Sequence, residues 1–231
     1  MKRFIGISRL ACLLFLCMCA HVEGHAQIKV ACIGNSITFG SGIENRAVYS
    51  YPAQLQLILG DQWEVRNFGV SGRTMLKKGN QPIWNEDAFA QALAYQPDVV
   101  IIKLGTNDSK TGNWQHKAEF KPDYQAMVDT FKSVGHPMIF VCRPVPAFGN
   151  SWTISSAVVA NEIVPIIDEI GKENSLQVID LFTPFRSKKD LFPDLIHPNG
   201  HGAALMAGII ARDLMKNYTA IVEQKIFNSN N

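Results

Sequence analysis

The sequence predicts an α/β fold built on a parallel sheet, and three observations support this. Apolar runs of strand length alternate with amphipathic stretches of helix length along most of the 231 residues. The apolar runs are nearly continuous and rich in β-branched residues, as expected of strands buried on both faces. Loops with polar residues and glycines follow several of these runs, and ligands bind at such carboxyl ends in open α/β sheets. We therefore expect the functional site at that edge of the sheet.

Five strands and five helices account for the pattern. The expected strands are Ile28–Ile33, Trp63–Phe68, Val99–Leu104, Met138–Cys142 and Gln177–Leu181. The expected helices are Tyr51–Leu59, Glu86–Tyr95, Tyr124–Val134, Ser155–Glu173 and Gly200–Tyr218. No repeat or linker interrupts residues 27–220, so we expect one domain there, followed by a C-terminal tail over residues 221–231 with a polar, frayed end.

Residues 1–26 have the pattern of a secretory signal peptide. Three basic residues precede an apolar run from Leu10 to Ala20 that is too short for a membrane-spanning helix, and small residues follow it. Cleavage after Ala26 would release a secreted or periplasmic protein whose mature chain does not insert into a membrane. The alternative is an uncleaved N-terminal anchor.

The charge of the mature chain argues against two classes of partner. The whole chain has a formal net charge of +2, and the expected signal peptide holds three basic residues and one acidic residue. The mature chain is therefore formally neutral. A neutral chain gives no electrostatic reason to bind nucleic acid or an anionic membrane surface.

Two of the five cysteines, Cys32 and Cys142, remain after the expected cleavage. They fall in strands that we do not expect to be neighbours, so their Cα atoms should be too far apart for a disulfide and we predict two buried thiols. No spacing of cysteines and histidines indicates a metal site, and we expect no cofactor.

A serine, a histidine and an aspartate are candidates for nucleophilic catalysis. Ser36 follows the first expected strand in a glycine-bearing turn, and a serine hydroxyl is a poor nucleophile until a neighbouring base removes its proton. His197 is the expected base, because Asp194 comes three residues earlier and can accept its Nδ1 proton. His201 is a second candidate base without an equally placed acid. The structural alternative is an ordinary turn serine and an Asp-His pair that only stabilises its loop.

Acyl transfer also requires N–H donors for the negatively charged oxygen of the tetrahedral intermediate. The candidates are the backbone N–H groups of Ser36 and Gly72 and the side-chain amide of Asn107. Taken singly, Gly72 and Asn107 are ordinary turn residues. Together with the candidate nucleophile and base, they predict a serine esterase.

Four segments of the chain resemble the signature blocks of the SGNH hydrolases, also called GDSL esterases. The segments are Gly34-Asn35-Ser36, Gly72, Gly105-Thr106-Asn107-Asp108 and Asp194-Leu195-Ile196-His197, in the order of the family. The resemblance spans about residues 28–216 and implies a flavodoxin-like three-layer α/β/α sandwich with a five-stranded parallel sheet. It also implies that Ser36, His197 and Asp194 form a catalytic triad and that the three donors named above form the oxyanion hole. We interpret Asp108 as a residue that holds its loop, not as a base.

Two segments near the candidate site are similar to those of secreted bacterial sialate O-acetylesterases and related carbohydrate esterases. These segments are residues 67–74 and 103–110, and the similarity implies the removal of acetyl groups from sialic acid or other glycans. Arg73 can pair with a substrate carboxylate such as that of sialic acid. Three tryptophans fall in expected loops, namely Trp84, Trp114 and Trp152. A loop tryptophan either stacks on a sugar or packs within its loop. We select Arg73 and Trp114 as candidate substrate contacts.

Three other functions agree with parts of the sequence. A lysophospholipase or thioesterase of the same family would need an apolar groove for a long acyl chain, and no exposed apolar run indicates one. A catalytically silent carbohydrate-binding module would have no use for the full set of catalytic positions. An FMN-binding flavodoxin would need a first loop richer in serine and threonine than the one at Ser36. No feature of the sequence indicates an oligomeric state.

Overall fold

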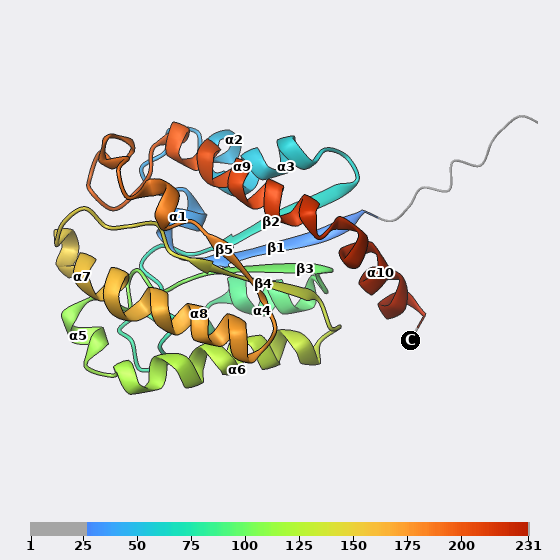
Figure 1. Cartoon of the computed structure of the whole chain (residues 1–231), viewed down its shortest axis with the longest axis horizontal. Coiled ribbons are helices and arrows are strands. Elements are labelled where there is room, and N and C mark those ends of the chain that lie inside the picture. Colours follow the sequence, from blue (N-terminus) through green and yellow to red (C-terminus); the bar gives the residue numbers. More distant parts are fainter. Residues whose placement is uncertain (1–26, 231) are drawn as a thin grey trace, which may run out of the picture.

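A five-stranded parallel sheet forms the middle layer of the molecule (Figure 1). The computed structural model describes residues 27–230. The strands are β1 (Ile28–Gly34), β2 (Trp63–Gly69), β3 (Val99–Lys103), β4 (Met138–Arg143) and β5 (Gln177–Asp180). They pair in the order β2-β1-β3-β4-β5, so β1 lies between β2 and β3. The predicted parallel α/β fold with five strands is confirmed.

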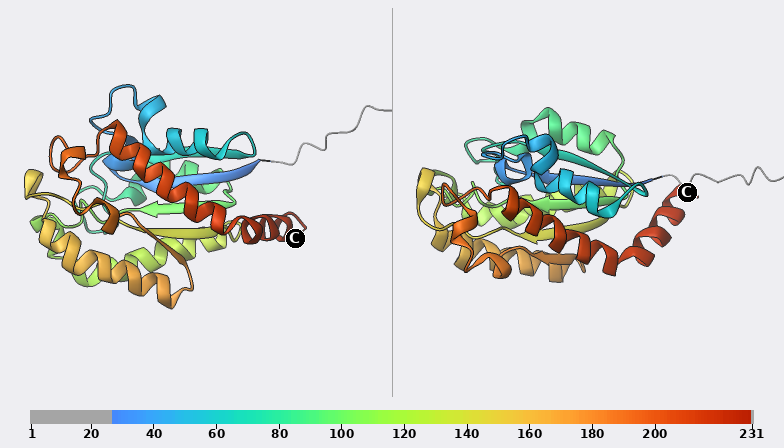
Figure 2. Two further views of the ribbon diagram at one scale, coloured as in Figure 1. Left: turned by 45° about the horizontal axis from the view of Figure 1, so that its top comes forward. Right: turned by 90° about the horizontal axis from the view of Figure 1, so that it is seen from above.

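Helices cover both faces of the sheet (Figure 2). The helices are α3 (Tyr51–Leu59) and α9 (Gly200–Lys216) on one face, and α4 (Asp87–Ala94), α6 (Phe120–Ser133) and α8 (Val164–Glu173) on the other. Consecutive residues of β1 contribute to the two cores in turn: Val30 and Cys32 belong to the first, and Ala31 and Ile33 to the second. Because both of its faces are buried, β1 needs an almost continuous apolar sequence.

Shorter helical segments lie in the connecting loops. The short α-helices are α1 (Ser36–Phe39), α2 (Arg46–Tyr49), α5 (Thr111–Trp114) and α7 (Ser156–Val158). The 3₁₀ turns are Ile83–Asn85, Lys117–Glu119, Ser151–Thr153, Thr183–Phe185 and Lys189–Leu191. The four short α-helices gather at the carboxyl ends of the strands, where the functional site is expected (Figure 1).

The helix predicted over residues 155–173 is divided in the structure. It consists of α7, a π-helical turn at Val159–Ile163, and α8. Pro165 has no N–H to donate, and a proline ring clashes with the carbonyl group four residues earlier in a regular helix. The wider turn just before Pro165 accommodates both effects.

A tail was expected over residues 221–231. In the structure, residues 221–229 instead form most of α10 (Tyr218–Ser229). Ile221 is buried, and Lys225 Nζ lies 2.7 Å from Asp98 Oδ2. Tyr218 and Val222 line a shared pocket with Ile28, so α10 lies beside the start of β1. The polar end of the chain did not predict this helix, because a short helix gains most of its stability from the core that its apolar residues join.

Several other expectations concern the chain outside the active site. Cys32 and Cys142 are buried free thiols on β1 and β4, which β3 separates, as predicted. Within residues 27–230 no helix has both the length and the apolar character that a bilayer-spanning helix needs. The expected signal peptide lies outside the described residues and stays a prediction.

Candidate active site

Ser36 lies at the junction between β1 and α1. A Cβ atom at Gly34 would overlap with the Thr38 side chain, so the chain needs glycine where it leaves the strand. Asn35 then caps α1, and its Oδ1 accepts the backbone N–H of Ile37 at 3.1 Å. The candidate nucleophile is thus the first residue of a helix that begins almost at the strand end.

Ser36, His197 and Asp194 form one hydrogen-bonded chain. His197 Nε2 lies 2.7 Å from Ser36 Oγ, although 161 positions separate the two residues. His197 Nδ1 lies 2.6 Å from Asp194 Oδ2. With its proton on Nδ1, the ring donates to Asp194, and Nε2 can accept the Ser36 hydroxyl proton. The structure therefore brings the three residues of the predicted triad together in the geometry that a serine, a general base and an orienting acid require.

Further hydrogen bonds fix Asp194. Its Oδ1 accepts the backbone N–H of His197 at 2.7 Å and that of Ile196 at 3.0 Å. Partial burial acts to raise the pKa of this carboxyl group, but the hydrogen bonds from His197 and Ile196 outweigh it, and the pKa lies below its ordinary value. Asp194 therefore stays ionised at neutral pH, when it can stabilise an imidazolium ion on His197.

The turn between Asp194 and His197 depends on a left-handed backbone at Leu195, with φ of 71°. A non-glycine residue holds this conformation only where its surroundings determine it, and functional sites are enriched in such residues. Leu195 O accepts the backbone N–H of Phe148 at 2.9 Å. This candidate catalytic turn is therefore joined to residues 147–154, called the Trp152 loop below. No feature of the sequence had indicated this contact.

The three expected oxyanion donors come from three loops. The Ser36 N–H is the first of α1 and has no acceptor within its own helix. Gly72 has φ of 83°, a conformation that glycine adopts without strain. Asn107 Nδ2 donates to Arg73 O at 3.1 Å, which leaves its second N–H for a substrate oxygen. Because Arg73 follows Gly72 directly, this bond ties two of the three donors together.

Asp108 connects the same two loops from beneath. It is fully buried, and its two carboxylate oxygens accept the backbone N–H groups of Leu76 at 2.8 Å and Met75 at 3.2 Å. Burial raises the pKa of Asp108 to about 6, although these backbone hydrogen bonds act to lower it. Asn113, which we had not singled out, adds to the support by donating to Asn107 O at 2.8 Å. Asp108 thus holds the loop, as interpreted from the sequence.

The sequence profile of the GDSL-like lipase/acylhydrolase family matches residues 32–205, a span that includes the complete hydrogen-bonded chain and the three expected donors. This chain belongs to that family. An acetylxylan esterase from Xylanibacter ruminicola is 49% identical to it over 203 residues. The aligned region covers 80% of this chain and 42% of that protein, so the chain spans less than half the length of this relative.

Solved structures of other proteins have the same fold. A carbohydrate acetylesterase from Sinorhizobium meliloti superposes with a TM-score of 0.68 at 18% identity, covering 82% of this chain and 99% of that chain. An acetyl xylan esterase superposes with a TM-score of 0.61 at 21% identity, covering 81% of this chain and all of that chain. The three-layer sandwich with a five-stranded sheet, as in other SGNH hydrolases, is thereby confirmed.

The side chains of the two expected substrate contacts in this GDSL-family chain are engaged within the protein. Arg73 Nε donates to Glu86 Oε1 at 2.8 Å, and Nη2 lies 2.8 Å from the same oxygen in an ion pair. Arg73 Nη1 donates to Ser71 O at 2.7 Å. Trp114 is 8% exposed, and its Nε1 donates to Glu162 at 3.0 Å. A paired guanidinium group and a buried ring leave little for a substrate to bind.

Lys103 is a buried amine near the candidate nucleophile that the apolar strand pattern did not reveal. It ends β3 with no exposed surface, and its Nζ lies 3.3 Å from Asn35 Oδ1. Burial lowers the pKa of Lys103 from 10.5 to about 7. The cap of the nucleophile helix therefore has an amine as neighbour that is only partly charged near neutral pH.

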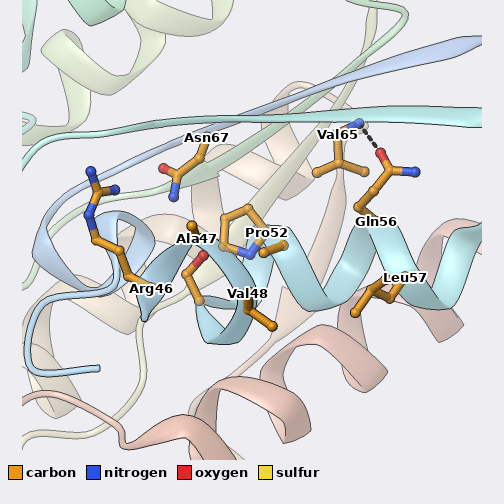
Figure 3. A pocket seen from close by; sticks show the side chains of 10 residues that line it. Arg46, Ala47, Val48, Pro52, Gln56, Leu57, Val65 and Asn67 are labelled. Carbon is orange, nitrogen blue, oxygen red and sulfur yellow. Dashed lines mark hydrogen bonds between the residues drawn. The ribbon is translucent and has the colours of Figure 1, made fainter. Parts of the chain in front are cut away.

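Two surface pockets lie apart from this site. One, of about 450 Å³, lies beside β2, with Arg46 and Asn67 at one end and Gln56 and Val65 at the other (Figure 3). The other, of about 690 Å³, is lined in part by His201, which is exposed on α9. No triad residue lines either pocket. Since His197, not His201, contacts Ser36, the competing base is rejected on geometry.

Proposed function

We propose that this protein is a serine esterase that removes acetyl groups from sugar hydroxyls, with acetylated xylan or a related glycan as its substrate. The hydrogen-bonded chain of Ser36, His197 and Asp194 carries the proposal. Membership of the GDSL-like lipase/acylhydrolase family and the 49% identity to an acetylxylan esterase support it.

The main physical reason for expecting a sialic acid substrate no longer applies. That expectation relied on Arg73 as a partner for the sugar carboxylate, and Arg73 is paired with Glu86. A neutral sugar needs no such cation. We therefore place neutral acetylated glycans first and keep O-acetylated sialic acid as a substrate to be tested.

In the first half-reaction Ser36 Oγ attacks the acetyl carbonyl carbon while His197 Nε2 takes the hydroxyl proton. The carbonyl oxygen becomes an oxyanion, which accepts hydrogen bonds from the backbone N–H groups of Ser36 and Gly72 and from the second N–H of Asn107. The bond to the sugar oxygen then breaks, and that oxygen takes the proton from His197. The sugar leaves with a free hydroxyl group, and the acetyl group stays on Ser36.

In the second half-reaction a water molecule attacks the acetyl group on Ser36. His197 takes one proton from the water and returns it to Ser36 Oγ as the acyl bond breaks. Acetate leaves, and the enzyme returns to its starting state. Asp194 stabilises the imidazolium ion in both half-reactions through its bond to Nδ1.

We further propose that the protein acts outside the cytoplasm, in the periplasm or beyond the cell, after cleavage near Ala26. The pattern of residues 1–26 supports this location. A polysaccharide substrate agrees with this location, because such polymers occur outside the cell.

The test is the release of carboxylic acid by the purified protein from four substrates: acetate from acetylated xylan, O-acetylated sialic acid and ethyl acetate, and the fatty acid from a lysophospholipid. Wild type is compared with Ser36→Ala and with Ser133→Ala, which removes an exposed hydroxyl from α6. We expect wild type and Ser133→Ala to release acetate from the xylan, and Ser36→Ala to be slower by a factor of about 10⁴ or more. Thermal unfolding of the three proteins shows whether each is folded.

Each result has a definite meaning. Full activity of a folded Ser36→Ala protein would reject Ser36 as the nucleophile. Hydrolysis of the lysophospholipid alone would favour a lysophospholipase. A folded wild-type protein that binds xylan but hydrolyses none of the four substrates would favour a carbohydrate-binding module.

A further inference from the structure

Trp152 is an exposed aromatic side chain beside the catalytic base. Its residue is 62% exposed, and its ring centroid lies 5.0 Å from that of His197, with the two planes inclined by 51°. The other two loop tryptophans are engaged elsewhere. Trp84 donates to Met75 O at 2.7 Å and packs against Phe89, and Trp114 is buried.

The Trp152 loop is fixed at both ends, although its tip is exposed. Near its start, Phe148 N–H donates to Leu195 O in the catalytic turn. At its end, Ile154 packs in a small apolar cluster with Ala147 and Ile196. The position of Trp152 relative to His197 is therefore set by contacts on both sides of it.

The backbone at the tip of the loop is strained. Trp152 and Thr153 have φ of 55° and 61°, and neither is a glycine. Two successive non-glycine residues in the left-handed region are uncommon, and such residues cluster at ligand sites. This conformation holds a large, mostly exposed ring beside His197, where a substrate at the site can reach it.

The chemistry of the reaction places the sugar on this side of the site. When the acetyl–enzyme forms, His197 Nε2 must give its proton to the sugar oxygen that leaves. The sugar ring carrying that oxygen must therefore lie within reach of His197, next to the Trp152 ring. The apolar C–H face of a pyranose ring can stack on an indole ring, whereas a carboxylate anion is disfavoured by the negative face of that ring.

We propose that Trp152 is a binding platform for the sugar ring that leaves, and that the Trp152 loop makes the enzyme selective for esters of neutral pyranoses over esters of simple alcohols. This inference rests on the proposed function, because it concerns the leaving group of that reaction. Trp152 acts in binding and orientation, and the chemical step belongs to the triad.

The first test compares Trp152→Ala and Trp152→Phe with wild type on acetylated xylotetraose and on ethyl acetate, whose leaving group has no ring. Loss of the platform should raise KM for the xylotetraose ester about tenfold in Trp152→Ala, while the rate on ethyl acetate stays within about twofold. Trp152→Phe should retain most of the affinity for the sugar. Tyr49→Ala, which removes an exposed aromatic ring from α2, should leave both substrates unaffected.

Equal loss of activity on both substrates would overturn the proposal, because Trp152 would then only support or shield His197. Unchanged kinetics on both substrates in Trp152→Ala would overturn it as well.

A binding measurement separates this inference from the proposed function. Deacetylated xylotetraose should change the tryptophan fluorescence of Ser36→Ala, and the change should vanish when Trp152→Ala is added. If this change occurs while Ser36→Ala still hydrolyses the ester, the catalytic proposal fails and the platform stands. If wild type hydrolyses acetylated xylotetraose but the fluorescence does not respond, the platform fails and the catalytic proposal stands.

Discussion

Replacing Lys103 with methionine should stabilise the protein at neutral pH, and the gain should shrink as the pH rises. Lys103 is fully buried at the end of β3, and the hydrogen-bond partner of its amine is Asn35 Oδ1 at 3.3 Å. Desolvation disfavours the charged form, which lowers the pKa from 10.5 to about 7. Methionine has a similar length and no charge, so it can fill the same space without this penalty.

The magnitude follows from the two pKa values. Between about pH 7 and pH 10.5 the unfolded chain keeps a proton on Lys103 that the folded chain has lost, so the free energy of unfolding rises with pH. The free energy of unfolding of the wild type should rise by roughly 2 kcal/mol between pH 7 and pH 9 because of Lys103. A Lys103→Met protein has no such proton, and its advantage over wild type should narrow by the same amount.

Urea unfolding at pH 7, 8 and 9, followed by circular dichroism, measures this difference. Ile102→Val, an apolar change at the neighbouring core position, serves as control and should cost about 0.5–1.5 kcal/mol at every pH. A difference in the free energy of unfolding between wild type and Lys103→Met that stays constant from pH 7 to pH 9 would mean that Lys103 does not lose its proton in this range. The reasoning from burial would then be refuted.

Two further predictions concern the loops that hold the proposed oxyanion hole. Asn107→Ala removes one donor and should lower kcat on acetylated xylotetraose about 10²- to 10³-fold with little change in KM; a change confined to KM would instead place Asn107 in ground-state binding. Asp108→Asn puts an NH₂ group opposite the N–H of Leu76 or Met75, so the free energy of unfolding in urea should fall by about 1–3 kcal/mol. Unchanged stability would mean that these N–H groups find other acceptors.

The sequence predicts best what local pattern determines. Strands buried on both faces need long apolar runs, so β1 and β3 could be drawn from the order of the residues alone. The meeting of Ser36 with His197 was predictable because loops at the carboxyl ends of parallel strands share one edge of the sheet. The hydrogen bond between Asp194 and His197 was predictable because only three positions separate them.

What the sequence did not predict depends on partners that are distant along the chain. The sequence favoured Arg73 as a ligand of a substrate carboxylate, but in the structure Arg73 Nη2 lies 2.8 Å from Glu86 Oε1. Trp114 and Trp152 are equivalent in pattern, and only the packing of their loops buries one ring and exposes the other. The helical end of the chain was missed for the same reason, because Ile221 becomes a core residue only beside a sheet.

The two ends of the described chain lie together at the amino ends of the strands, opposite the loops that hold Ser36, with the start of β1 next to α10 (Figure 1). Anything joined to either end, such as a second folded module, a surface attachment or a purification handle, would project away from Ser36. A bulky polymeric substrate, as proposed above, could then still approach the face that holds Ser36. The architecture therefore lends itself to modular fusion, since new attachments need no change in the loops that carry the chemistry.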